Sequence, residues 1–255
     1  MNKLFAMLPC FNEELNISAL IDSWITQRDS LSSKGYELQV CPIDDCSTDN
    51  TKAVIIQKQE QYPETVCPIF HKVNKSLGGG VNSSIAYFLE HGTNEDLMCL
   101  MDGDNSHDPK YVHSMLEKLK DGVECVIASR YQQGSKIFGV PFHRRLMSDM
   151  ARIYYTIILG VPNVRDYTCG YRLYKYNAVK RLSEKFGEPI IQEKSFACMM
   201  EFLYKLYLSG TKFAETGFEL RYDKKLGDSK MNVTSTARKS LSAALRLRKI
   251  RSKES

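Results

Sequence analysis

The sequence Leu-Met-Cys-Leu-Met-Asp-Gly-Asp-Asn-Ser-His-Asp-Pro occupies residues 97–109. Its first five residues are apolar, which is typical of a strand buried in a parallel sheet. Two carboxylates, Asp102 and Asp104, follow directly, and Gly103 between them allows close approach of backbone and ligand. Side chains at this end of a strand face the ligand crevice of α/β proteins, where two carboxylates can bind Mg²⁺ or Mn²⁺ and, through it, a diphosphate. The alternative is a surface turn, since Asp, Gly and Asn are ordinary turn residues.

Strands and helices alternate regularly through the first half of the chain. Apolar runs predict strands over residues 3–8, 36–43, 66–73, 97–101 and 124–129. Polar turns lead from the first four strands into helices that are predicted to end near residues 27, 61, 91 and 120. Asn12 is expected to cap the first helix. This order predicts an α/β fold with a doubly wound, mostly parallel sheet and helices on both faces.

The pattern changes after residue 129. Residues 141–159 predict an amphipathic helix on which Arg144 and Ser148, four residues apart, share one face. A core-packing helix with a solvated basic side is the alternative interpretation. Further predicted elements are an apolar helix over 197–209, a strand over 212–221, a basic loop over 222–231 and a basic helix over 235–251.

Charge is distributed unevenly along the 255 residues. The net charge is +5, but residues 221–255 carry 11 Lys and Arg against 3 Asp and Glu, so the rest of the chain is slightly acidic. A basic end on a near-neutral body favours contact with an anionic surface. Nucleic acid is disfavoured, because the basic end lacks interleaved aromatic residues.

The cysteines and apolar runs indicate the compartment. The eight cysteines contain no CxxC pair, which favours a reducing environment. No secretory pattern begins the sequence, and the longest apolar run, 153–161, is far shorter than the ~20 residues that span a bilayer. We therefore expect a cytoplasmic protein without a transmembrane helix that binds peripherally to the cytosolic membrane face.

The sequence lacks the motifs of several common nucleotide-binding, hydrolase and metal sites. No Gly-x-Gly-x-x-Gly follows the first predicted strand, and Gly78–Gly80 lacks the Lys-Ser/Thr of a P-loop. There is no Gly-x-Ser-x-Gly elbow, and the five histidines have no metal-binding spacing. A nucleotidyltransferase would need a glycine-rich, lysine-containing loop directly after the first strand, and this loop is absent. What remains is a set of acidic turns at three strand ends.

Three motifs carry a family resemblance. Pro-Cys-Phe-Asn-Glu (9–13), Ile-Asp-Asp-Cys-Ser-Thr-Asp-Asn-Thr (43–51) and Met-Asp-Gly-Asp (101–104) follow successive predicted strands. In this order they resemble the inverting glycosyltransferases of family 2, which have the GT-A fold. Four later motifs are similar to the dolichyl-phosphate mannose synthase subgroup: Ser129-Arg130-Tyr131, Arg144-x-x-x-Ser148, Asp166-x-Thr168-x-Gly170-Tyr171-Arg172, and Phe218-x-x-Arg221 with Gly227-Asp228-Ser229-Lys230. The resemblance implies one catalytic domain over residues 1–232 and a basic helical tail over 233–255.

The resemblance also implies a donor site. Residues expected to line the nucleotide site are Pro9, Asn12 and Glu13, with Asp44 and Asp45 at the base and ribose. Asp102 and Asp104 would hold Mg²⁺ or Mn²⁺ on the sugar-nucleotide diphosphate, and Asp104 is counted as catalytic. The residues expected to close over that diphosphate are Arg221, Ser229 and Lys230.

An acceptor site is implied as well. Arg130, Arg144 and Ser148 would receive the phosphate of a polyprenyl phosphate. Such an acceptor is already an anion, so it needs orientation more than deprotonation. The resemblance therefore implies inverting transfer of a hexose, with mannose from GDP-mannose as the family's usual donor and glucose from UDP-glucose next.

Two alternatives stay open. A family 2 transferase acting on a saccharide or small-molecule hydroxyl would need a general base, for which Asp166 and Glu201 are candidates. A binding module without activity would have a broken set of metal- or phosphate-binding residues. Two positions depart from the family: Cys46 replaces a glycine after the paired aspartates, and Ser106 stands where relatives often carry an amide, which leaves the third metal ligand open.

Overall fold

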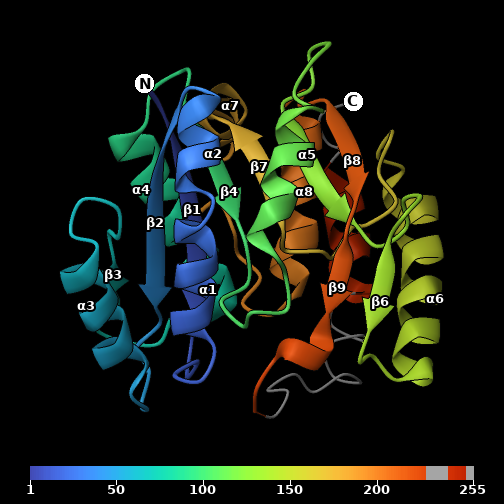
Figure 1. Cartoon of the computed structure of the whole chain (residues 1–255). Helices are drawn as coiled ribbons and strands as arrows, with labels where there is room; N and C mark the ends of the chain where they lie inside the picture. The colour runs from blue at the N-terminus through green and yellow to red at the C-terminus, as the bar shows by residue number, and fades with distance from the viewer. Residues whose placement is uncertain (228–240, 251–255) are drawn as a thin grey trace.

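The chain folds around a seven-stranded sheet. The computed structural model describes residues 1–227 and 241–250, without the side chains of residues 143 and 144. The order across the sheet is β3-β2-β1-β4-β7-β5-β8 (Figure 1). The strands are β1 (Asn2–Cys10), β2 (Tyr36–Asp44), β3 (Ile69–Phe70), β4 (Leu97–Leu100), β5 (Cys125–Ser129), β7 (Arg172–Lys175) and β8 (Phe213–Gly217). Only β7 runs antiparallel to its neighbours, β4 and β5. The predicted α/β fold with a mostly parallel sheet is confirmed.

Helices cover both faces of this sheet. Figure 1 shows α1 (Ile17–Ile25), α2 (Arg28–Ser33) and α5 (Val112–Leu116) in front of the strands. On the other face, α4 (Ser76–His91), α7 (Tyr176–Phe186) and α8 (Ala197–Leu208) contact one another. The remaining helix beside the strands, α3 (Thr51–Gln61), packs against α1 and β2. The central strand β1 is therefore buried on both sides, and Leu4 to Leu8 are fully enclosed.

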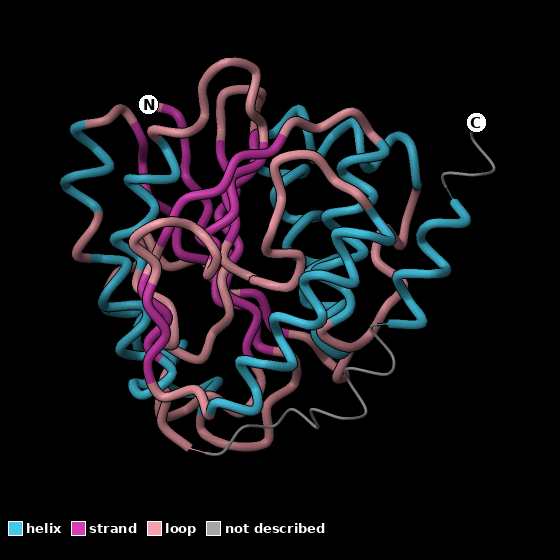
Figure 2. Tube along the Cα trace, turned by 90° about the vertical axis from the view of Figure 1, so that its right-hand side faces the viewer, coloured by secondary structure: helices cyan, strands magenta, loops and turns pink. Residues whose placement is uncertain are grey.

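A smaller layer lies beside β8. Here β6 (Lys136–Phe138) pairs with β9 (Glu219–Arg221), and the long helix α6 (Phe142–Leu159) runs along their outer side (Figure 1). Residues 241–250 form a helix seen near the carboxyl end in Figure 2. It packs onto α6 and the core, because the Tyr154 hydroxyl donates to the Leu241 carbonyl at 3.1 Å and Ala243 and Ala244 are buried.

Local differences from the predicted elements have identifiable causes. Asn12 does not cap a helix: its φ is +55°, and its side-chain oxygen accepts from the Thr48 N–H at 2.8 Å. The first helical segment divides into α1 and α2, and α1 begins only at Ile17. The predicted helix over 109–120 is a 3₁₀ turn (Pro109–Tyr111) followed by the short α5. β3 is much shorter than the predicted 66–73, although Val66 still bridges Val40. The predicted boundary between residues 232 and 233 lies outside the described residues.

Three strand ends meet at one edge because of the register. Parallel pairing places Cys10 beside Asp44 and Met7 beside Leu100. Beyond β4, the Gly103 N–H donates to the Pro9 carbonyl at 3.1 Å. A Cβ at Gly103 would lie 2.7 Å from Cys10 Cβ, so packing against β1 requires a glycine at this position. The acidic turn after β4 is thereby fixed to the end of the central strand.

A buried arginine holds the turn that enters β7. Arg172 is fully buried, and its guanidinium donates to the carbonyls of Met199, at 2.7 Å, and Tyr167, at 2.8 Å. These bonds connect β7 to the start of α8 and to the turn over residues 166–170. Since peptide carbonyls buried without a donor are costly, this side chain stabilises both segments.

Replacing Arg172 should be strongly destabilising. We expect Arg172→Met to lower the free energy of unfolding by about 2–4 kcal/mol, because two buried hydrogen bonds from a charged donor are lost. Urea denaturation followed by circular dichroism measures this. The control is Arg181→Met, which removes a surface pair with Glu124 and should cost about 1 kcal/mol or less. Equal losses in the two variants would contradict the role given to Arg172.

Candidate active site at the carboxyl edge of the sheet

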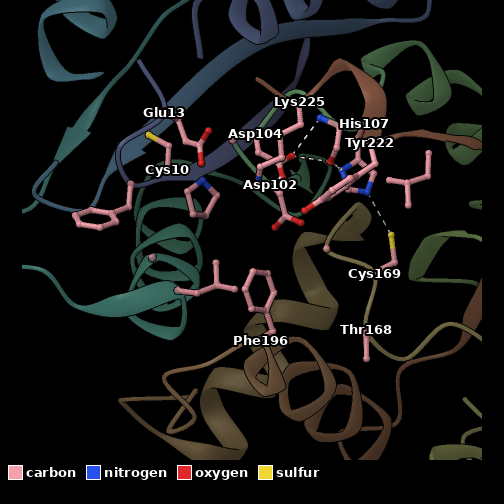
Figure 3. A pocket seen from close by; sticks show the side chains of 18 of the residues that line it. Cys10, Glu13, Asp102, Asp104, His107, Thr168, Cys169, Phe196, Tyr222 and Lys225 are labelled. Carbon is pink, nitrogen blue, oxygen red and sulfur yellow. Dashed lines mark hydrogen bonds and ion pairs between the residues drawn. The ribbon is translucent and has the colours of Figure 1, made fainter. Parts of the chain in front are cut away.

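A pocket of about 650 Å³ lies where the ends of β1, β2 and β4 meet. Its other walls come from the start of α4, from α6, from the turn over 166–170 and from residues 222–225 (Figure 3). Seven of the predicted site residues line it: Pro9, Glu13, Asp45, Asp102, Asp104, Arg130 and Ser148. Asn12, Asp44 and Arg221 do not line it. The Arg144 side chain, Ser229 and Lys230 lie outside what the structure describes.

Asp102 and Asp104 form the acidic floor of the pocket. Burial, together with the neighbouring charge of Asp104, raises the pKa of Asp102 to about 7. No described residue donates a hydrogen bond to the Asp102 carboxylate, and the backbone passes close by, since a Cβ at Gly170 would lie 2.8 Å from Asp102 Oδ1. Burial alone would also raise the pKa of Asp104, but the Lys225 ammonium, His107 and the hydrogen bond from Ser106 together lower it. The pair thus concentrates negative charge, part of which the Lys225 ammonium offsets.

The two oxygens of Asp104 have different partners. The Ser106 hydroxyl donates to Oδ1 at 2.6 Å, and the Ser106 N–H donates to the same oxygen at 3.1 Å. The Lys225 ammonium lies 2.8 Å from Oδ2 (Figure 3). The Lys225 ammonium therefore already occupies Oδ2, whereas Oδ1 is taken by Ser106. Within the described ranges, no group of three or more His, Cys, Asp and Glu side chains is arranged to hold a metal ion.

Lys225 was not singled out by the sequence, although it lies in the predicted basic loop. The segment that carries it is attached at both ends: the Arg221 N–H donates to the Ser106 carbonyl at 3.0 Å, and the Leu226 N–H donates to Asn16 Oδ1 at 2.9 Å. The Asn16 amide also donates to the Leu226 carbonyl and to Glu13. Tyr222 and Lys225 are thus placed over the acidic floor. The only sequence signal for this was a basic run following a predicted strand.

The wall near β2 and α4 is acidic and tightly hydrogen-bonded. Asp45 Oδ1 lies 2.7 Å from His71 Nδ1 and accepts from the Lys75 N–H at 2.7 Å. Asp44 instead accepts from the Ser47 N–H within its own turn, at 3.2 Å. Cys46 adopts φ +61°, so the turn keeps the left-handed conformation that a glycine would favour. Cys46 therefore occupies a backbone conformation that a glycine adopts more readily.

The opposite wall is built around Arg130. Its guanidinium forms a fork on Asp166, with N···O distances of 2.6 and 2.8 Å, and donates to Thr168 Oγ1 at 2.7 Å. Asp166 is fully buried, and although burial would raise its pKa, Arg130 and the surrounding hydrogen bonds lower it. Other residues of this wall are Val140, Met147, Ser148, Ala151, Cys169 and Leu220. None of the described residues on this wall other than Arg130 is charged.

The two carboxylates considered as general bases have structural partners. Asp166 accepts from Arg130 and from the Cys169 N–H, at 3.1 Å. Glu201 is 3% exposed, accepts from the N–H groups of Gln192 and Glu193, and pairs with Lys205 at 2.7 Å. Neither lies free in the pocket, so neither is placed to remove a proton from an acceptor hydroxyl.

Comparison with known proteins supports the resemblance. Among curated proteins, a polyprenol monophosphomannose synthase of Mycolicibacterium smegmatis is 24% identical over 231 residues, covering 90% of this chain and 81% of that protein. An undecaprenyl-phosphate mannosyltransferase of Micrococcus luteus is 26% identical over 231 residues, covering 90% of this chain and 88% of that protein.

Solved structures show the same fold. A structure described only as a mycobacterial protein matches 96% of this chain and 74% of its own, with a TM-score of 0.67 and 15% identity. Mannosyl-3-phosphoglycerate synthase from Rubrobacter xylanophilus matches 99% of this chain and 74% of its own, with a TM-score of 0.58 and 14% identity. The mannosyltransferase PcManGT from Pyrobaculum calidifontis, in complex with GDP-Man and Mn²⁺, matches 96% and 69%, with a TM-score of 0.54 and 16% identity.

The match to a family is the decisive comparison. Residues 6–183, more than half of the chain, match the family described as glycosyl transferase family 2. This span contains the acidic floor, Arg130 and Asp166. The α/β architecture and the order of the motifs agree with that assignment. The chain belongs to glycosyl transferase family 2.

Proposed function

We propose that this chain is an inverting mannosyltransferase that moves mannose from GDP-mannose to a polyprenyl phosphate. The observation that carries the proposal is the division of the pocket by charge. Four carboxylates, Asp102, Asp104, Glu13 and Asp45, and one ammonium, Lys225, lie on the donor side, whereas Arg130 is the charged described residue that lines the acceptor wall. The names of the two curated relatives include mannose and a polyprenyl phosphate, and the structural neighbour PcManGT was solved with GDP-Man.

The acceptor wall suits a phosphate better than a hydroxyl group. Arg130 keeps its charge and is held in place by Asp166, so it can orient an anion through charge-assisted hydrogen bonds. An acceptor phosphate oxygen attacks the anomeric carbon as the bond from that carbon to the donor diphosphate breaks, and no proton has to be removed. A hydroxyl acceptor would need a base, and Asp166 and Glu201 both have structural partners instead. In this account Ser148, and Arg144 on the same predicted helix, also contact the acceptor phosphate.

The donor side is proposed to include a divalent cation. Asp102 and Asp104 supply two oxygen ligands, which fits Mg²⁺ or Mn²⁺ because such ions are often held by one or two carboxylates with substrate phosphates and water. The ammonium of Lys225 on Asp104 supports this, since it marks the pair as a cation site. A bound divalent cation would stabilise the negative charge that develops on the departing diphosphate. Pro9, Glu13 and Asp45 line the pocket and are proposed at the nucleoside. Ser229 and Lys230 are proposed at the diphosphate, whereas Asp44 and Arg221 do not line the pocket and are given no substrate contact in this proposal.

The acceptor's long apolar chain leads to a proposed membrane contact. One face of α6 carries Met147, Ser148 and Ala151 into the pocket. The other face exposes an apolar stripe at helical spacing, formed by Phe142, Leu146, Met150, Ile153 and Ile157. In the proposed tail, 233–255, the helix over 241–250 adds exposed Leu241 and Leu245 and the basic Arg246, Arg248 and Lys249. Such a surface fits the headgroup region of an anionic membrane. No helix among the described residues is long and apolar enough to cross a bilayer.

Transfer of labelled mannose tests the reaction. With GDP-mannose, a short polyprenyl phosphate and Mg²⁺ or Mn²⁺, we expect product that disappears with EDTA. Asp104→Asn should reduce the rate at least about 100-fold, because it removes a cation ligand. Asp22→Asn is the control, since Asp22 pairs with Lys58 outside the pocket. Transfer that survives both EDTA and Asp104→Asn would contradict the cation site.

The role of Arg130 is tested by measuring the KM for polyprenyl phosphate and the KM for GDP-mannose separately. Arg130→Lys keeps a positive charge beside Asp166 but loses the guanidinium fork. We expect the KM for polyprenyl phosphate to rise about tenfold or more, with little change in the KM for GDP-mannose. The control is Arg165→Met, an exposed neighbour that does not line the pocket. If only the KM for GDP-mannose rises, Arg130 contacts the donor, and its proposed role at the acceptor is contradicted.

The membrane surface is tested by co-sedimentation with vesicles that contain an anionic phospholipid. The double variant Met150→Glu, Ile157→Glu should reduce binding at least about tenfold, because two apolar side chains no longer enter the headgroup region. Ile56→Glu places the same charge at an exposed isoleucine of α3 and should bind normally. Activity on a short, water-soluble acceptor should persist in the double variant. Unchanged vesicle binding would show that α6 is not the contact.

A further inference from the structure

A chain of hydrogen bonds leads from Asp104 into the protein interior. Ser106 Oγ lies 3.1 Å from His107 Nδ1, and Cys169 Sγ lies 3.8 Å from His107 Nε2. Figure 3 shows His107 between Asp104 and Cys169, with a dashed line from its ring to the Cys169 sulfur. Ser106, His107 and Cys169 are all buried. The proposed function gives none of the three a role, although all line the pocket.

The direction of this chain follows from the donors and acceptors. The Ser106 hydroxyl gives its proton to Asp104 Oδ1 at 2.6 Å, so it can only accept from His107. His107 Nδ1 therefore carries the hydrogen, and Nε2 is left as an acceptor facing the Cys169 thiol. Burial lowers the pKa of His107 to about 4 and raises the pKa of Cys169 to about 12, which agrees with a neutral ring and a protonated thiol.

The histidine ring is fixed independently of these bonds. It stacks on Phe218, with ring centroids 5.3 Å apart and planes inclined by 19°, and meets Tyr171 edge-on at 5.8 Å. These ring contacts, with the burial of His107, favour the orientation in which Nδ1 meets Ser106. The hydroxyl is thereby held on Asp104 Oδ1, and Oδ2 remains the oxygen that pairs with Lys225.

We propose that His107 is a positioning residue that, through Ser106, fixes the orientation of the Asp104 carboxylate, which would be a ligand of the divalent cation. This rests on the proposed cation site. Ser106 then donates a hydrogen bond to Asp104 and is not itself the third ligand of the cation. Residues that hydrogen-bond to a metal ligand affect the affinity of the site for the metal ion, and their loss typically weakens metal binding 10- to 100-fold.

The test measures Mn²⁺ affinity of the full chain by isothermal titration calorimetry, without donor. Ser106→Ala and His107→Phe should each weaken Mn²⁺ binding about tenfold, since each removes the same link. The double variant should be little weaker than either single variant, because both act through one hydrogen bond. Ser106→Thr keeps the hydroxyl and His107→Asn keeps an N–H near the Nδ1 position, so both should retain affinity close to that of the unmodified chain.

Control variants distinguish a positioning role of His107 from a general loss of stability and from the absence of a cation site. Tyr171→Phe removes the Tyr171–Pro109 hydrogen bond from the same aromatic layer and should leave Mn²⁺ affinity unchanged, even if the melting temperature falls. If Ser106→Ala and His107→Phe bind Mn²⁺ as tightly as the unmodified chain while Asp104→Asn does not bind it, the role of His107 is contradicted and the cation site is not. Absence of Mn²⁺ binding by the unmodified chain would contradict the inference and the cation site together.

Discussion

The repulsion between two carboxylates at the end of a buried strand is the constraint on which the rest of the site depends. Asp102 and Asp104 share a confined edge, and burial together with the charge of Asp104 raises the pKa of Asp102 to about 7. The surrounding structure offsets this charge from several directions. Lys225 pairs with one oxygen of Asp104, Ser106 donates to the other, and the buried Arg172 lowers the pKa of Asp102 in part. A diphosphate can join such a floor only with a cation between them.

The second half of the pocket has the opposite character. Arg130 is held by Asp166, whose own N–H and that of Arg165 donate to Glu215 at 2.7 and 2.8 Å. The guanidinium is therefore fixed by a layer of hydrogen bonds beneath the turn over residues 166–170. One wall suits a cation-bound diphosphate and the other suits an anion approaching from α6. Transfer of a sugar from a diphosphate to a phosphate needs that separation, because both substrates are anions and must not compete for the same charges.

Much of the fold could be predicted from the sequence, because the signals are local. Apolar runs ending in polar turns marked β1, β2, β4 and β5, and the carboxylates after β4 marked the pocket edge. The antiparallel β7 could not be predicted in the same way, since its four residues acquire their place from pairing with β4 and β5. Asn12 resembled a helix cap in sequence, yet contacts with the loop after β2 hold it in a left-handed conformation.

The site was less predictable than the fold for the same reason. Asp166 was considered as a base from its motif alone, and only its contact with Arg130, 36 residues away, explains its burial and lowered pKa. Lys225 meets Asp104 across 121 residues of sequence, and Cys169 meets His107 across 62. No spacing rule connects positions so far apart. The residue types pointed to the chemistry, and the tertiary contacts assigned each side chain its partner.

The central claim is that the acceptor is a phosphate, and a pair of acceptors that differ only in that group tests it most directly. The chain would be incubated with labelled GDP-mannose and Mn²⁺, together with either a short polyprenyl phosphate or the matching polyprenol. The account predicts labelled product from the polyprenyl phosphate and none from the alcohol. Equal transfer to the alcohol would contradict it, because the hydroxyl would then be deprotonated by a base that the described acceptor wall does not supply.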